Sequence, residues 1–329
     1  MKHILTLLII SVLLAACSSK ELIYNSVKGP VFGTSFLIYY KYEKNKNLDK
    51  DILRVMKEFN SSLSSYDSSS VISRFNKNDS EVVADHYFTK CFERARKISV
   101  STKGAFDMTV APLVNLWGFG FSREDSVYPG LIDSLLNYVG YEKVVLKDGK
   151  LIKENPEIML DASAIAKGMG VDVVSEFLES LGIDNYLVEI GGELRCRGLN
   201  PKDSLWRVGI DKPLENMLER ELQEILTLTN ISMATSGNYR QFYERDGVKY
   251  SHTIDPYTGY PVRHSLLSAT VLAEDCMTAD AYATAFMVMG LDKTRQLIEV
   301  DSTLEALLIY SDEDGNLTTW TSEGMAGKL

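Results

Sequence analysis

The chain of 329 residues has four cysteines, four histidines and no block of basic residues, and each shortage excludes a class of protein. Acidic residues outnumber Lys and Arg by 45 to 35, giving a formal net charge of -10 at pH 7. Because a nucleic-acid surface requires clustered positive charge, we expect no nucleic-acid partner. The sequence also has no CxxC pair and no HExxH motif, so neither pattern of zinc ligands is present.

The apolar run at the N-terminus, Ile4–Leu14, is too short to span a bilayer. It follows Lys2 and ends in Leu14-Ala15-Ala16-Cys17, which resembles the cleavage signal of a bacterial lipoprotein. We therefore expect the mature chain to begin at Cys17, with lipid on this residue. An ordinary secretory peptide cleaved before Cys17 is the alternative.

This interpretation divides the chain into a signal peptide (1–16), a lipidated polar tether (17–30) and one folded domain (31–329). The expected location is a membrane, reached by export, which means the periplasmic side in a Gram-negative cell. The cysteines that remain, Cys91, Cys196 and Cys276, are odd in number, so at least one is expected to be free.

Segments with strand and helix periodicity follow one another without a long linker or a repeat, which predicts a single α+β unit with antiparallel hairpins and packed helices. Predicted helices occupy 49–63, 85–102 and 277–289. Predicted strands occupy 31–40, 158–160, 186–195 with a Gly-Gly bulge, 206–210, 222–228, 266–273 and 304–310. Asp148-Gly149 and Asp246-Gly247 predict hairpin turns, and the small residues of 233–240 predict another turn.

The stretch Asp161–Gly168 joins the apolar run 158–160 to a segment of helical periodicity. The start of a helix offers free backbone N–H groups, and Lys167 adds a positive charge, so we expect a phosphate-bearing ligand there. The alternative is that Asp161 or Ser163 caps the helix and Lys167 is solvated.

Asp280 and Thr284 are four residues apart on the predicted helix 277–289 and so lie on one face. A carboxylate and a hydroxyl suit a hard cation such as Mg²⁺, with backbone carbonyls and water completing its oxygen ligands. The alternative is that Thr284 bonds its own backbone and Asp280 faces water.

In combination, the motifs of this chain resemble those of the FAD:protein FMN transferase family, the ApbE-like flavinylating lipoproteins. The resemblance covers the chain from about Val31 to Trp320. Its motifs, in order, are Phe-Gly-Thr at 32–34, Ser-Arg-Phe-Asn at 73–76, Gly-Ala-Phe-Asp at 104–107, Pro-Leu-Val-Asn-Leu-Trp-Gly-Phe-Gly at 112–120, Asp-Ala-Ser-Ala-Ile-Ala-Lys-Gly at 161–168, Glu-Ile-Gly-Gly-Glu at 189–193, Ala-Thr-Ser-Gly-Asn-Tyr at 234–239, Ser-His-Thr-Ile-Asp-Pro at 251–256 and Ala-Asp-Ala-Tyr-Ala-Thr at 279–284.

The resemblance implies two intertwined α/β subdomains with the flavin site between them. The residues implied for the FAD site are Phe32, Tyr66, Ala105, Phe106, Asp107, Asp161, Lys167 and Ile254. The carbonyl of Ala164, together with Asp280 and Thr284, is implied to hold Mg²⁺. Some relatives have another carboxylate where this chain has Ala283, so water or a backbone oxygen would replace that ligand.

The implied reaction is attack of a Thr or Ser hydroxyl of an acceptor protein on the FMN-side phosphorus of FAD, with release of AMP. His252 is our candidate for the base that takes the hydroxyl proton, and Asp280 contributes to catalysis through the cation. The alternative for His252 is a hydrogen bond that stabilises its loop. The chain lacks an Asp-x-x-Ser-Gly-Ala-Thr acceptor segment of its own, so the acceptor is a separate protein, such as a subunit of a membrane redox complex.

Two other functions remain open. Water in place of the acceptor hydroxyl would make the protein an FAD pyrophosphatase, although the aromatic Tyr66 favours transfer by resemblance. A flavin-binding lipoprotein without chemistry is the second, but storage of FAD does not require a metal at the pyrophosphate, so the pair Asp280 and Thr284 argues against it.

Overall fold

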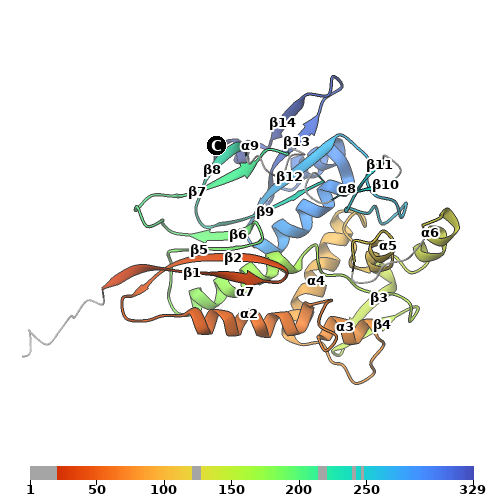
Figure 1. The fold of residues 1–329 in the computed structure, drawn as a ribbon, viewed down its shortest axis with the longest axis horizontal. Helices are drawn as coiled ribbons and strands as arrows, with labels where there is room; N and C mark the ends of the chain where they lie inside the picture. Colours follow the sequence, from red (N-terminus) through yellow and green to blue (C-terminus); the bar gives the residue numbers. More distant parts are fainter. Residues whose placement is uncertain (1–20, 121–126, 214–220, 239–241, 246–247) are drawn as a thin grey trace, which may run out of the picture.

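An antiparallel sheet of eight strands, in the order β1-β2-β5-β6-β9-β12-β13-β14, forms the centre of the molecule (Figure 1). The structure is a computed structural model that describes residues 21–120, 127–213, 221–238, 242–245 and 248–329. The strands are β1 (Leu22–Val31), β2 (Thr34–Glu43), β5 (Tyr186–Ile190), β6 (Glu193–Arg197), β9 (Ile231–Gly237), β12 (Leu266–Ala273), β13 (Glu305–Ser311) and β14 (Leu317–Thr321). The predicted α+β class with antiparallel sheets and packed helices is confirmed.

The long helices cover one face of this sheet. They are α2 (Asp49–Leu63), α4 (His86–Ser101), α7 (Ala166–Ser180) and α8 (Cys276–Val300). Helix α7 contacts β5 and β6, while α8 contacts β9 and β12, and the two helices contact each other. The alternation of β2 explains this side of the core, because Phe36, Ile38 and Tyr40 all point to the helices and are buried there.

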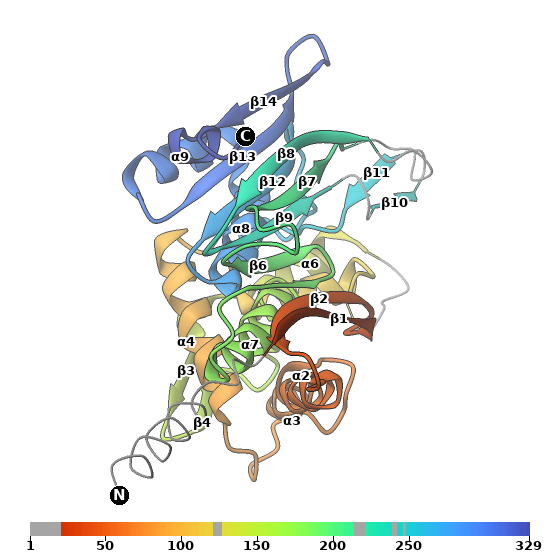
Figure 2. The same cartoon turned by 90° about the vertical axis from the view of Figure 1, so that its left-hand side faces the viewer.

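The other face of the sheet is covered by the hairpin of β7 (Trp206–Asp211) and β8 (Leu222–Leu228) and by the short helix α9 (Glu323–Ala326). Tyr39 of β2 points to this face and packs against Trp206. Figure 2 shows α2 and α7 on one side of β1 and β2 and the β7–β8 hairpin on the other side.

Smaller elements surround the centre. They are α3 (Val71–Asn76), α5 (Ala111–Leu116), α6 (Pro129–Leu136), the 3-10 turns η1 (Met108–Val110) and η2 (Tyr141–Lys143), and the hairpins β3–β4 (Val144–Lys147, Lys150–Lys153) and β10–β11 (Phe242–Arg245, Val248–Ser251). The predicted hairpin at Asp148-Gly149 is confirmed, with both residues at positive φ. Strands β10 and β11 pair as predicted, while the turn between them lies outside the described residues. No helix in the described ranges is long and apolar enough to cross a membrane.

The tether ends earlier than we expected. Residues 22–30, which the sequence analysis assigned to a polar tether, form most of β1 and pair with β2 along its whole length. The two strands are joined by Phe32 and Gly33, both at positive φ, as a tight two-residue hairpin requires. Polar residues in β1 concealed the strand, because an edge strand exposes much of its surface. Cys17 itself lies outside the described residues.

Three local predictions were wrong. Gly191-Gly192 is a hairpin turn between β5 and β6, not a bulge within one strand. The small residues predicted as a turn at 233–240 belong mostly to β9, which lies between β6 and β12 and is covered by α8. The third wrong prediction, the strand at 158–160, is treated with the site. The predicted helix 277–289 is confirmed as the first part of α8, which breaks at Gly290 (φ 75) before a second helical part continues to Val300.

Candidate active site

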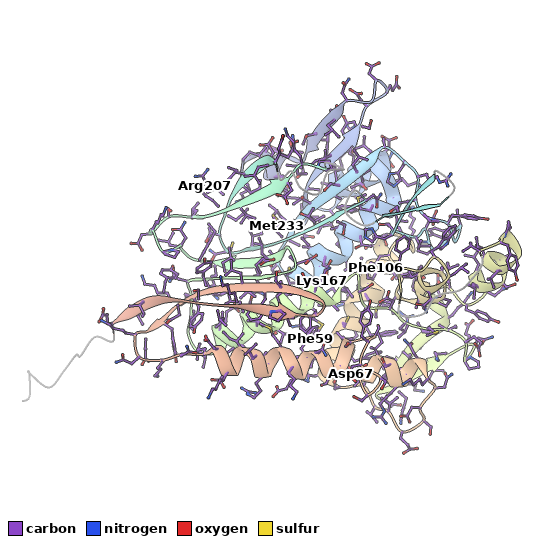
Figure 3. All side chains as sticks on the ribbon, viewed as in Figure 1. Phe59, Asp67, Phe106, Lys167, Arg207 and Met233 are labelled. Carbon is purple, nitrogen blue, oxygen red and sulfur yellow. The ribbon has the colours of Figure 1, made fainter. Side chains whose placement is uncertain are left out.

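One cavity of about 680 Å³ lies among the end of α2, the start of α7, the first part of α8, the β5–β6 turn, β7, β9 and the loop that follows β11. Every predicted cofactor, metal and catalytic residue of the described chain lines it: Phe32, Tyr66, Ala105, Phe106, Asp107, Asp161, Ala164, Lys167, His252, Ile254, Asp280 and Thr284. Figure 3 labels the lining residues Phe59, Phe106, Lys167 and Met233 near the middle of the molecule. Residues more than 200 positions apart in sequence therefore meet in one space.

The segment before α7 is held in place without being a strand, which corrects the prediction for 158–160. The side chain of Asn76 takes the place of a neighbouring strand: it accepts from Leu160 N at 2.8 Å and donates to Leu160 O at 2.8 Å. Asp161 N then donates to Met108 O at 2.7 Å. The segment is thereby fixed where it enters the cavity, although no sheet partner extends along it.

Neither Asp161 nor Ser163 caps α7, so the alternative interpretation of this stretch is wrong. Helix α7 begins at Ala166 without a side-chain cap. The carboxylate of Asp161 instead accepts from the backbone N–H of Ser163 at 2.8 Å and from its hydroxyl at 2.9 Å. Burial raises the pKa of Asp161 above its ordinary value, and these two hydrogen bonds oppose the rise.

Lys167 lies between two buried carboxylates and is not a solvated lysine. Its Nζ is 2.9 Å from Oε1 of Glu193 and 3.6 Å from Oδ1 of Asp280. The side chain of Lys167 is 33% exposed, whereas the exposed fractions of Glu193 and Asp280 are 4% and 2%. Burial alone would lower the pKa of Lys167, but Asp280 and Glu193 outweigh it and raise this pKa above its usual range, so the ammonium is charged.

Glu193 was not predicted as a site residue, although the sequence analysis quoted its motif. Burial raises the pKa of its carboxyl group, Lys167 opposes the rise, and Asp280 adds to it. Its second oxygen, Oε2, is buried and has no hydrogen-bond partner among the described residues. A glutamate directly after Gly191-Gly192, at the start of a buried strand, was the available signal.

Asp280 joins the two helices of the site. Its Oδ2 accepts at 2.9 Å from the backbone N–H of Gly168, one of the N–H groups in the first turn of α7 that has no partner within the helix. The glycine is required, because a Cβ at this position would lie 2.3 Å from the carbonyl oxygen of Cys276 in α8. Asp280 is therefore fixed at the junction of α7 and α8 and does not face open water.

Thr284 lies on the same face of α8 as Asp280, and both line the cavity with Ala164. The Thr284 hydroxyl is 3.2 Å from the hydroxyl of Ser236 on β9, a neighbour that the sequence analysis missed because it treated this segment as a turn. Within the described residues, no three His, Cys, Asp or Glu side chains gather as a metal site. The groups available to a cation are therefore oxygen atoms of three kinds: the Asp280 carboxylate, the Thr284 hydroxyl and the Ala164 carbonyl.

Aromatic rings line the side of the cavity nearest α2. Phe32 and Phe59 pack edge to face with centroids 5.5 Å apart. Tyr66, which follows α2, lines the cavity and is 84% exposed, so its ring is available to a ligand. Phe106 and Ala105 are buried and also line the cavity.

Asp107 lies beside Phe106 and is held by three hydrogen bonds. Its Oδ1 accepts from the backbone N–H and the hydroxyl of Thr109, both at 2.7 Å, and its Oδ2 accepts from the backbone N–H of Tyr141 at 2.8 Å. Burial raises the pKa of Asp107 to about 6, while the hydrogen bonds from Thr109 and Tyr141 lower it.

His252 and Ile254 reach the cavity from the loop after β11. The imidazole of His252 packs edge to face on Phe119 with centroids 6.3 Å apart. Ile254 is buried and forms an isolated antiparallel bridge with Pro261, which closes the loop. The loop thus places an imidazole at the wall of the cavity.

Comparison with known proteins gives a consistent answer. A family model described as the ApbE family matches residues 32–308. The chain is 41% identical over 316 residues to a protein of Vibrio cholerae named FAD:protein FMN transferase, covering 93% of each chain. It is 38% identical over 315 residues to a protein of the same name from Haemophilus influenzae, covering 91% of this chain and 90% of that protein.

Two solved structures are similar along nearly the whole chain. The structure described as the flavin transferase ApbE from Vibrio cholerae matches with a TM-score of 0.85 and 38% identity, covering 94% of this chain and 100% of that one. The apo form of a flavinyl transferase ApbE from Pseudomonas stutzeri matches with a TM-score of 0.82 and 29% identity, covering 95% of this chain and 98% of that one.

Proposed function

Since this chain belongs to the ApbE family of flavin transferases, we propose that it moves FMN from FAD onto a Thr or Ser hydroxyl of an acceptor protein through a phosphoester bond, with the help of Mg²⁺. The observation that carries the proposal is the gathering of the whole predicted residue set around one cavity of about 680 Å³. This volume is within the range of pockets that hold ligands of this kind.

The chemistry of the walls fits the parts of FAD. The exposed ring of Tyr66 offers a stacking surface, and Phe32 and Phe106 add apolar wall. The charged ammonium of Lys167 suits the pyrophosphate, which carries the negative charge of the molecule. The segment before α7 brings backbone into the cavity next to Lys167, where side chains are small.

The residues present fit a hard divalent cation. Asp280, Thr284 and the carbonyl of Ala164 would hold it, all through oxygen atoms. Among the described residues, Lys167 is the one cationic group paired with the carboxylates of Asp280 and Glu193, so two carboxylates share one ammonium beside a site for an anionic substrate. Bound Mg²⁺ would supply charge neutralisation at the pyrophosphate.

In the proposed reaction the acceptor hydroxyl oxygen forms a bond to the FMN-side phosphorus, and the bond from this phosphorus to the oxygen of AMP breaks. His252 takes the hydroxyl proton, and AMP leaves with the electron pair of the broken bond. Lys167 stabilises the negative charge on the phosphoryl oxygens. The cavity holds the flavin so that its phosphate meets the acceptor and not bulk water.

We further propose that lipid on Cys17 anchors the protein to a membrane after export. Because β1 begins at Leu22, the stretch between the anchor and the folded domain can span at most about 17 Å. The domain would therefore work close to the bilayer surface, where an acceptor in a membrane complex would meet it.

The test combines the purified protein with FAD and Mg²⁺, with and without an acceptor domain that carries an Asp-x-x-Ser-Gly-Ala-Thr segment. Transfer predicts AMP release together with flavin fluorescence that stays on the acceptor after denaturation. AMP and free FMN without an acceptor, and no adduct with one, would identify a pyrophosphatase. FAD binding without AMP in either arm would identify a storage protein.

A further inference from the structure

Glu193 contributes to the site but has no step in the proposed reaction, and only one of its carboxylate oxygens has a partner. Oε1 lies 2.9 Å from Nζ of Lys167, whereas Oε2 is buried without a hydrogen-bond partner in the described part of the chain. Leaving a buried acceptor without a partner destabilises the fold. An oxygen retained at this cost indicates that another state of the site uses it.

The position of Lys167 indicates which state this is. Its ammonium is within reach of both carboxylates, at 2.9 Å from Glu193 and 3.6 Å from Asp280. Asp280 is also the one charged ligand of the proposed cation site. A lysine that pairs closely with Asp280 competes with a divalent cation for the same carboxylate, because like charges repel at short range.

We propose that Glu193 is a positioning residue that draws Lys167 away from Asp280 and so keeps Asp280 open to the cation, an inference that rests on the cation site of the proposed function. The terminal torsion of a glutamate is soft, so its carboxylate can turn Oε2 toward the ammonium and hold it with both oxygens. Lys167 then stays at the cavity wall beside the phosphates, and two positive groups coexist in one site.

The experiment is a cycle of variants read out by Mn²⁺ affinity, with no FAD present. Full-length protein with the substitution Glu193→Gln, Lys167→Met or both is titrated with Mn²⁺, and free Mn²⁺ is followed by its electron paramagnetic resonance signal. With Lys167 present, Glu193→Gln releases the lysine onto Asp280, and Mn²⁺ binding weakens about tenfold, or about 1.4 kcal/mol. In the Lys167→Met background the same change costs less than about threefold, because no competing ammonium remains.

Lys167→Met alone strengthens Mn²⁺ binding, since it removes the positive charge beside Asp280. The matched control is Glu189→Gln, on the same hairpin: Glu189 accepts at 2.6 Å from the backbone N–H of Gly192 and is not among the residues that line the cavity. Its Mn²⁺ affinity stays at that of the unsubstituted protein. Thermal unfolding of each variant verifies that the chain is folded.

An equal loss of affinity from Glu193→Gln in both backgrounds overturns the proposal, because Glu193 would then act by its charge alone. Weaker Mn²⁺ binding by Lys167→Met overturns it as well, and this single variant decides the question if Glu193→Gln does not fold. Absence of Mn²⁺ binding by the unsubstituted protein, with flavin transfer intact in a metal chelator, overturns the cation site itself and this inference with it.

Discussion

The close approach of α7 and α8 at Gly168 makes Gly168→Ala the sharpest test of how the site is built. A Cβ at this position would lie 2.3 Å from the carbonyl oxygen of Cys276 and 2.8 Å from Cβ of Asp280. Carbon-to-oxygen contacts across such interfaces are about 3.3 Å or longer, so the helices would have to separate by roughly 1 Å. No flexible side-chain end can move aside, because the nearest atoms belong to backbone.

The magnitude follows from two losses and one gain. Overpacking of this kind costs about 1–3 kcal/mol. Separation by roughly 1 Å also lengthens the hydrogen bond from Gly168 N–H to Asp280, now 2.9 Å, beyond the usual limit. Alanine returns about 1 kcal/mol of helix propensity. We expect a net loss of about 2 kcal/mol, a fall in Tm of several degrees, and loss of most of the flavin transfer because Asp280 moves.

The assay is thermal and urea unfolding of the variant together with AMP release from FAD. Gly130→Ala is the matched control, because Gly130 is also helical and its added Cβ would meet only ordinary contacts, the nearest at 3.7 Å. The turnover of Gly130→Ala should equal that of the unsubstituted protein, and its Tm should be equal or slightly higher. Full stability and full turnover in Gly168→Ala would show that the helices have room to spare and that the carboxylate is not held by their contact.

Four other predictions follow. Asp280→Asn can still accept from Gly168 N–H through its amide oxygen, so it should remain folded by circular dichroism and lose AMP release; normal turnover would refute the metal assignment. Tyr66→Asn removes an exposed ring at the cavity and should shift products from flavinylated acceptor toward free FMN, measured after denaturation; an unchanged ratio would place the ring off the flavin. Burial raises the pKa of Asp107 from 3.8 to about 6, so its contribution to stability, about 3 kcal/mol, is complete below pH 4 and is lost as the pH rises through 6. In Asp107→Asn the free energy of unfolding should therefore fall less between pH 4 and pH 8 than in the unsubstituted protein. The same fall in both proteins would mean that Asp107 titrates normally. Cys17→Ser should leave the protein unlipidated without altering turnover of the folded domain, and acyl labelling of the variant at a normal level would contradict the lipid assignment.

The sequence predicted correctly those helices and turns whose ends depend on interactions between residues close together in the chain. The helix at 85–102 was predicted from the spacing of its apolar residues, and in the structure the side chain of Asp85 caps it by accepting from Phe88 N. The hairpin was predicted from the pair Asp148-Gly149, and both residues adopt the positive φ that such a turn requires. In each case, the interactions that define the element lie within a few residues along the chain, where a pattern can reveal them.

Elements defined by distant partners were missed. The segment 158–160 has an apolar, strand-like sequence, but Asn76, which is 84 residues away, supplies its backbone hydrogen bonds in place of a strand. Strand β9 has the small residues of a turn because α8 packs closely over it. Its neighbours β6 and β12 decide its conformation, and neither can be read from its own sequence.

The site shows the same limit at the level of single residues. Each family motif is a contiguous stretch of sequence, so the resemblance could identify the candidate residues. The structure shows that these residues meet in one cavity. Glu193 belongs to such a motif too, but its relation to Lys167 depends on how β6 meets α7 in space. Its unpartnered oxygen becomes visible only once every neighbour is placed.

The pairing of α7 with α8 explains why the site can be both buried and charged. Asp172 of α7 accepts from the first two backbone N–H groups of α8, at Cys276 and Met277, with distances of 2.9 and 2.8 Å. Asp280 of α8 accepts in return from Gly168 near the start of α7. Each helix thus supplies the carboxylate that satisfies the other helix at its N-terminal end, where the helix dipole favours negative charge.

The two carboxylates of this reciprocal arrangement have basic partners of different kinds. Arg195 pairs with Asp172 at 3.2 Å, and neither residue lines the cavity, so this carboxylate is not presented to a ligand there. Lys167 pairs with Asp280 at the longer distance of 3.6 Å and lines the cavity. The contact of Asp172 with the start of α8 therefore fixes the two helices relative to each other. The contact of Asp280 with the start of α7 does the same, and it also leaves the Asp280 carboxylate and the Lys167 ammonium available to a substrate.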